Sequence, residues 1–201
     1  IYTRQNPVAN HDLFLKLEDL GCEVRPAPFL VDEVDFGLRK GLENKFLSRR
    51  YPEAAVSGLL YLRKELHKWK VRQRLESAGL DSDPSFREIV RFSAPYVGLE
   101  NNEIVLLNIA RMVDYARKGA DGVINAICFN CMLGTVSAAI AARVRKDSGD
   151  IPIPTFIYAG TELAAERTKL EAFVYQVKQS TARRWKADSS GRPLTRGFSS
   201  C

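Results

Sequence analysis

Cys128 and Cys131 are the two residues of this sequence whose type and spacing suggest chemistry. They follow an apolar run, residues 123–127, and precede small, helix-compatible residues over 134–142. This pattern predicts a strand, a loop and a helix. The two thiols would then lie at the carboxyl end of the strand, close to a helix N-terminus, where the helix dipole and free backbone N–H groups favour a thiolate. Ligands bind at this edge in open α/β sheets, so we expect the functional site there.

The spacing of this cysteine pair allows several chemistries. The simplest interpretation is structural, with two semi-buried cysteines at the end of a strand. Thioredoxin-type redox chemistry uses the same spacing but expects it soon after a first strand and near a cis-proline, whereas this pair comes late in the chain. An iron–sulfur cluster needs about four thiolates, so a partner domain would have to complete one. A zinc site would also need further ligands, for which the chain offers His11, His67, Cys22 and Cys201.

Other residues suited to catalysis are scarce. His11 and His67 are far apart in the sequence and neither falls in the expected loops, so a Cys–His or Ser–His arrangement lacks a base. Glu162, Glu166 and Glu171 belong to the last loop and helix, where helix-start and surface roles are favoured over acid–base catalysis. The glycine motifs that bind nucleotide phosphates do not occur.

The cysteine pair needs a scaffold that places it. Strands alternating with helices predict an α/β fold, a small parallel Rossmann-like sheet flanked by helices, with a helical insertion between its second and third strands. The first strand would precede residue 1, so we expect the chain to be part of a longer protein. In chain order we expect a helix at 13–20, a strand at 22–28, a helix at 104–116, a strand at 123–127, a helix from Gly134, a strand at 151–158 and a last helix with Leu170, Phe173, Val174 and Val177 inward.

The helical insertion covers about residues 30–93. Its periodicity and its breaks predict three helices, at 30–49, 53–79 and 84–93. We interpret the basic run at 63–72 as a solvated helix face with Trp69 packed inward, in preference to a membrane or nucleic-acid surface.

The net charge of +6 is concentrated at the end of the chain. Residues 178–201 hold six basic residues and one acidic residue, which leaves a net charge of +1 for residues 1–177. A nucleic-acid-binding domain should carry a basic face on its folded body, so this distribution argues against that function. We expect residues 1–177 to form the domain and residues 178–201 to be a disordered basic tail, because this composition cannot bury enough surface.

Composition also bears on the location of the protein. No apolar run approaches the ~20 residues that a membrane helix needs, so no membrane partner is expected. Four cysteines do not make a disulfide framework in a chain of 201 residues, and Cys22 is expected to be a small buried hydrophobe. We therefore expect a reducing, cytoplasmic location.

Several segments, in the same order, resemble the 2-hydroxyacyl-CoA dehydratase family. Residues 119–124 followed by 129–132 are similar to its Gly-x-Asp-Gly-Val/Ile strand and Phe-Gly-Cys-Met/Leu-Pro loop. Residues 151–152 and 168–173 resemble its Ile-Pro strand and Thr-Arg-Ile/Leu-Glu-Ala-Phe element, and residues 1–10 resemble the end of its Gly-Glu-Ile-Tyr-x-Arg-x-Asn-Pro segment. The similarity covers most of the expected domain and extends to large proteins that fuse an ATP-hydrolysing activase to dehydratase-like domains.

The resemblance implies a function that residue patterns alone do not. In that family two Rossmann-like domains hold an iron–sulfur cluster of the 4Fe-4S type between them, and an activase drives low-potential electrons into it. The cluster reduces a CoA thioester, which allows a hydroxyl group to leave as water. Cys131 matches the family's cluster-ligand cysteine, whereas Cys128 has no such match. Asn130, Leu133 and Lys169 stand where the family has Gly, Pro and Arg.

We therefore expect the C-terminal domain of a dehydratase-like or activase-fused protein, inactive alone, that offers Cys131 and Cys128 to an iron–sulfur cluster completed by a partner domain or subunit. The implied partners are an N-terminal dehydratase-like domain, an ATP-hydrolysing activase and an acyl-CoA substrate. Two alternatives stay open. One is a non-catalytic interaction domain that keeps the fold without the cluster, and the other is a nucleic-acid binder that acts through the tail.

Overall fold

The computed structural model describes residues 6–27, 41, 44–78, 84–98, 100–159 and 165–188. The chain divides into two compact units. One unit combines Ile1–Ala27 with Val90–Cys201, and the other is Pro28–Ile89. The second unit lies close to the limits predicted for the helical insertion, residues 30–93.

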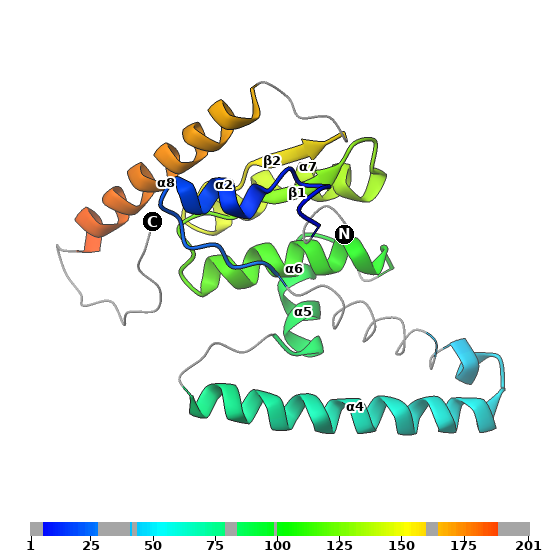
Figure 1. Ribbon diagram of the computed structural model, residues 1–201. Helices are drawn as coiled ribbons and strands as arrows, with labels where there is room; N and C mark the ends of the chain where they lie inside the picture. The colour runs from blue at the N-terminus through cyan, green and yellow to red at the C-terminus, as the bar shows by residue number, and fades with distance from the viewer. Residues whose placement is uncertain are drawn as a thin grey trace. The chain divides into compact units, whose positions relative to one another are not determined.

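Helices make up most of the described chain, and Figure 1 labels the elements. In the second unit lies α4 (Tyr51–Ser77), and α5 (Phe86–Ser93) crosses the division between the units. The first unit contains α2 (Leu13–Asp19), α6 (Glu103–Arg117), β1 (Asn125–Cys128), α7 (Met132–Asp147), β2 (Thr155–Tyr158) and α8 (Glu166–Asp188).

The two strands β1 and β2 form a parallel sheet. Cys128 pairs with Tyr158 at its end, so both strands finish at the same edge. Parallel strands need a crossover connection, which α7 provides. The α/β class is confirmed, but the strand predicted at 22–28 is wrong for the described residues 22–27, which form none. Pro26 removes a backbone donor from this segment and fixes its φ, which disfavours a place in a sheet.

Both strands of the sheet are also displaced from their predicted limits. The structure begins β1 two residues later than predicted and includes Cys128 in it. The prediction of a strand over 151–158 holds only for its second half, because Pro152 and Pro154 have no N–H to donate. Their carbonyls still accept hydrogen bonds, from Val123 and Asn125, each at 3.0 Å. The segments that precede the two strands are therefore also hydrogen-bonded to each other.

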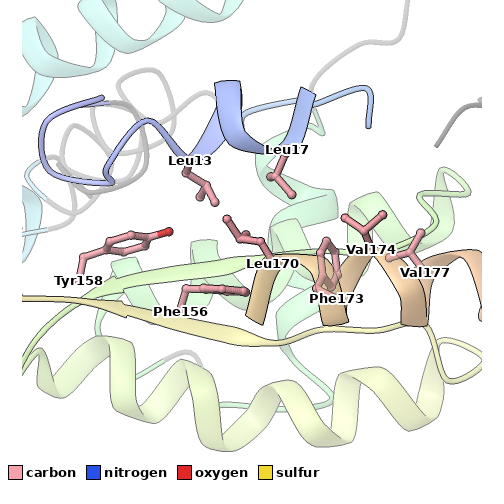
Figure 2. Packing of buried hydrophobic residues seen from close by; sticks show 8 residues of the cluster. All are labelled: Leu13, Leu17, Phe156, Tyr158, Leu170, Phe173, Val174 and Val177. Atoms are coloured by element: carbon pink, nitrogen blue, oxygen red, sulfur yellow. The ribbon is translucent and has the colours of Figure 1, made fainter. Parts of the chain in front are cut away.

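Helices α2 and α8 cover one face of the sheet, as Figure 2 shows. Phe156 and Tyr158 alternate along β2 and so point to this same face. The inward positions predicted for the last helix are confirmed. The buried cluster consists of Leu13, Leu17, Phe156, Tyr158, Leu170, Phe173, Val174 and Val177.

The other face of the sheet is covered by α7, which approaches β1 closely at Gly134. A Cβ atom built on Gly134 would lie 2.9 Å from both Cβ and Cγ2 of Ile127. Only glycine permits this distance between helix and strand. On its far side α7 packs against α6, whose N-cap is Asn102. The Asn102 side chain accepts a hydrogen bond from the Ile104 N–H at 2.9 Å.

The last helix, α8, continues to Asp188. Residues 178–188 are therefore helical, although their composition predicts disorder. Two contacts explain the difference. The Thr181 hydroxyl donates to Asp121 at 2.8 Å, and the Arg184 guanidinium donates to the same carboxylate at 2.6 Å. Residues 189–201, which include the rest of the predicted tail, lie outside the described residues.

In the second unit, α4 confirms the long helix predicted at 53–79, with ends shifted by two residues. The inward position predicted for Trp69 is wrong, because 54% of this residue is exposed. The buried positions of α4 are instead the small residues Ala54 and Ser57. Lys45 donates to the Ser57 hydroxyl at 2.8 Å, so a polar contact occupies this helix face. Of the helix predicted at 30–49, the structure describes only residues 41 and 44–49.

Candidate functional site

A tight turn between β1 and α7 carries both candidate cysteines. The Cys131 N–H donates to the Cys128 carbonyl at 3.3 Å, which closes the turn. Asn130 has a φ of 56°, in the left-handed region. This region costs most residues about 1–2 kcal/mol and is adopted most readily by Gly and then by Asn. Asn130 can therefore keep a backbone conformation in which glycine is favoured.

Cys131 is the N-cap of α7, so its predicted place near a helix N-terminus is confirmed. Its Sγ atom accepts a hydrogen bond from the Gly134 N–H at 3.4 Å. The first N–H groups of a helix have no intrahelical acceptor and carry partial positive charge. They can therefore stabilise negative charge on a sulfur ligand. The helix also begins two residues earlier than predicted, at Met132.

The surroundings of the turn are open. Cys128 is exposed and Cys131 is half-buried. Phe129 is 70% exposed and Met132 is 75% exposed, so apolar side chains flank both thiols. Contiguous apolar patches mark surfaces that contact another molecule, whereas single exposed apolar residues are common on any protein. The turn is thus accessible to a metal ion and to a second protein.

The described residues do not supply a complete set of ligands for zinc or for a cluster. No group of three or more His, Cys, Asp or Glu side chains in these parts of the chain could hold a metal ion. Cys22 packs against the cluster of α2, β2 and α8 but is half-buried, whereas the sequence predicts a buried position. It does not join the pair at the turn. The loop fits an iron–sulfur cluster only as a contributor of one or two ligands.

A second polar group lies at the same edge of the sheet. His11 precedes α2, and its Nδ1 atom lies 2.9 Å from Oε2 of Glu166, in the first turn of α8. The His11 ring also meets the Tyr158 ring edge-on, with 5.4 Å between centroids. His11 lies outside the predicted loops, as expected, but its contact with Tyr158 brings an imidazole to the sheet edge, where the sequence predicts no base.

This second group contains three buried atoms that have no hydrogen bond within the described residues: Nε2 of His11, the Tyr158 hydroxyl oxygen and Oε1 of Glu166. Lys16 lies 3.6 Å from Oε1 as an ion-pair partner. Burial, and then the charge of Glu166, raise the pKa of Tyr158 well above its usual value, so the hydroxyl stays protonated. The carboxylate favours the proton of a neutral His11 on Nδ1 and leaves Nε2 as an acceptor.

The strand register brings the two groups together. Cys128 and Tyr158 are paired residues, and the Phe129 N–H donates to the Tyr158 carbonyl at 2.8 Å. Paired residues of parallel strands point to the same face, so Cys128 lies on the face that carries Tyr158. The edge thus combines a thiol pair, suited to soft metals or redox chemistry, with an imidazole–carboxylate pair, suited to proton transfer.

The position of His11 at the sheet edge follows from the fold and not from a sequence motif. The loop that follows each strand of a parallel sheet lies at the carboxyl edge. Strand β2 ends at Tyr158, and the ring contact of His11 with Tyr158 places the imidazole at this edge. His11 and Tyr158 are far apart in the sequence, so no local pattern predicted their contact.

Other residues considered from the sequence lie elsewhere. His67 is exposed on α4, in the second unit. Glu171 forms an exposed ion pair with Arg167 at 3.1 Å, as expected for a surface carboxylate. Glu162 and Cys201 lie outside the described residues.

In the parts of the chain that the structure describes, no helix has both the length and the apolar composition needed to cross a membrane. No family model matches the chain, and neither a curated protein nor a solved structure matches it.

Proposed function

We propose that this chain is the C-terminal, Rossmann-like domain of a 2-hydroxyacyl-CoA dehydratase-like or activase-fused protein. In this proposal Cys131 donates a thiolate to an iron–sulfur cluster that a partner domain completes, and Cys128 is a further candidate ligand. The observation that carries the proposal is the position of Cys131, at the N-cap of α7 and at the carboxyl edge of the sheet. This is the edge at which α/β sheets bind ligands.

The open surface around the turn supports a shared cluster. Phe129 and Met132 expose most of their side chains on either side of Cys131. A partner domain that covers them would bury apolar area and bring its own cysteines to the turn, which the cluster requires because it needs about four thiolates. When bound, such a cluster would supply low-potential electrons to an acyl-CoA thioester. The chain alone would be inactive.

The residue that departs from the family pattern in the turn is compatible with this proposal. Asn130 replaces a glycine of the resembling family, and its φ of 56° is one that glycine also adopts readily. The replacement therefore preserves the backbone path that presents Cys131. The cytoplasmic location and the ATP-hydrolysing activase belong to the same proposal.

An anaerobic reconstitution with iron and sulfide tests the proposal on the longest native form of the protein. We expect a stoichiometric cluster by iron quantitation and EPR, and its loss or destabilisation in Cys131→Ser. Serine is a strong N-cap residue, so this variant keeps the start of α7. Cys22→Ser is the matched control and should retain the cluster, because Cys22 packs beside the hydrophobic cluster. Equal iron content in wild type and Cys131→Ser would refute the ligand role.

The exposed Phe129 and Met132 also favour a second function, a non-catalytic interaction domain that keeps the fold without a cluster. Absence of bound iron from the reconstituted native protein would support this function. A partner that still binds Cys131→Ser but not Phe129→Ser would do so too, because apolar contact and not metal would then hold the complex. The tail-mediated nucleic-acid function predicts instead that binding disappears when the residues after Lys178 are removed.

A further inference from the structure

Three sulfur atoms lie within five residues of the turn between β1 and α7. Cys128 is exposed, Cys131 is half-buried and Met132 is 75% exposed. The hydrogen bond from the Cys131 N–H to the Cys128 carbonyl holds the two cysteines at the ends of a four-residue turn. The Cα atoms at the ends of such a turn lie within about 7 Å of each other. Cysteines separated by two residues are a spacing at which two thiolates ligate one metal ion in proteins.

We propose that Cys128, Cys131 and Met132 form a site for a soft monovalent metal ion, Cu(I), which this chain completes by itself. Thiolate and thioether ligands select Cu(I) over hard cations, and this ion accepts roughly two or three sulfur ligands. A structural zinc ion or an iron–sulfur cluster needs about four ligands. The described residues offer no third His, Cys, Asp or Glu beside the pair. The ligand count of the turn therefore fits Cu(I) without a partner.

The N-terminus of α7 would stabilise negative charge in this site. Two thiolates with one Cu(I) ion carry a net negative charge, which the positive end of a helix stabilises. The Gly134 N–H already donates to Sγ of Cys131 at 3.4 Å. Exposure of Cys128 lets the ion enter and leave by exchange of thiol ligands. This site does not rest on the iron–sulfur proposal, although both metals would compete for Cys131.

Anaerobic competition with the chromophoric Cu(I) chelator bicinchoninate tests the site on the reduced full chain. We expect one Cu(I) ion per chain, withdrawn from the chelator. Loss of an outer-shell partner of a metal ligand already costs about 10–100-fold in affinity, so loss of a ligand in Cys128→Ser or Cys131→Ser should cost more than about 100-fold. Met132→Leu, which keeps the shape without the sulfur, should cost about 10-fold. Cys22→Ser should bind as the wild type does.

Retention of wild-type affinity by Cys128→Ser, or by the Cys128→Ser/Cys131→Ser double variant, would overturn the proposal. An equal loss in Cys22→Ser would overturn it as well. Thermal unfolding of each variant shows whether it is folded, and Cys128 is exposed, so its replacement should leave the fold unchanged. The two metal proposals fail separately, because the copper site requires this chain alone and the cluster requires the native partner. A chain that binds Cu(I) while the native protein holds no iron refutes only the cluster.

Discussion

We predict that Gly134→Ala destabilises the first unit although it improves helix propensity. The added Cβ would lie 2.9 Å from Cβ and Cγ2 of Ile127 and 3.2 Å from its Cδ1. Because Cβ of Ile127 is attached to the backbone of β1, a change of rotamer cannot relieve the contact. Helix and strand have to separate, and overpacking of this kind costs about 1–3 kcal/mol. Alanine returns up to about 1 kcal/mol through helix propensity, so the expected net loss is about 1–2 kcal/mol.

Thermal unfolding checks this magnitude. In a chain of this size, 1 kcal/mol corresponds to about 2–4 °C in Tm, so we expect a decrease of roughly 2–8 °C. Gly149→Ala is a useful comparison, because no atom lies within 4 Å of its added Cβ and φ is +74°. It should lose about 1 kcal/mol from backbone strain alone. An unchanged or raised Tm in Gly134→Ala would refute the close approach of α7 to β1, and with it the placement of the turn.

Three further predictions concern the sheet edge. Asn130→Gly should raise the free energy of unfolding by up to about 1 kcal/mol, by chemical denaturation, because glycine adopts the left-handed region without strain. His11→Ala should lower it by about 1.5–3 kcal/mol, since the Glu166 carboxylate would lose a buried hydrogen bond while Lys16 remains 3.6 Å away, and a neutral result would show that the hydrogen bond is not formed. Tyr158 has a raised pKa in the folded state, so its contribution is present below pH 10 and is lost as the pH rises above that value. Tyr158→Phe should therefore weaken the alkaline loss of stability, measured by Tm between pH 9 and about 11.

Periodicity predicted the elements of this fold better than their ends. The inward residues of α8 follow from their spacing, and the structure buries Leu170 and Val174 accordingly. The hydrophobic pattern at 123–127 did not predict that the strand extends to Cys128, which pairs with Tyr158. Strand pairing depends on the neighbouring strand and not on local hydrophobicity. Composition also predicted disorder after residue 177, whereas α8 continues through contacts to Asp121 that no local pattern encodes.

On α4 the sequence pattern misled for a different reason. Leu59, Leu62, Leu66 and Trp69 are spaced as a helical stripe, which normally indicates a buried face. The structure exposes all four by more than half and buries Ala54 instead. Small residues allow backbones to approach, so they can define a packed face that hydrophobicity alone does not reveal. The pattern correctly predicted the helix but wrongly predicted which of its faces is buried.

The candidate site was predictable where one local unit forms it. Strand, turn and helix are contiguous, so Cys128 and Cys131 could be placed at a strand end from the sequence alone. His11 and Glu166 are 155 residues apart, and only the tertiary fold brings them to 2.9 Å. No local spacing pattern could predict that His11 contacts Glu166, and no sequence motif surrounds His11.

The number of ligands separates the two metal chemistries open to the turn. A cluster takes about four thiolates, so its formation depends on cysteines that another domain must supply. Cu(I) is satisfied by the sulfur atoms of Cys128, Cys131 and Met132, so its binding depends on the turn alone. Cys128→Ser distinguishes them: it should abolish copper binding, whereas a cluster held through Cys131 should survive. Loss of both metals in this variant would make Cys128 a cluster ligand too, and the pair a single site with two possible occupants.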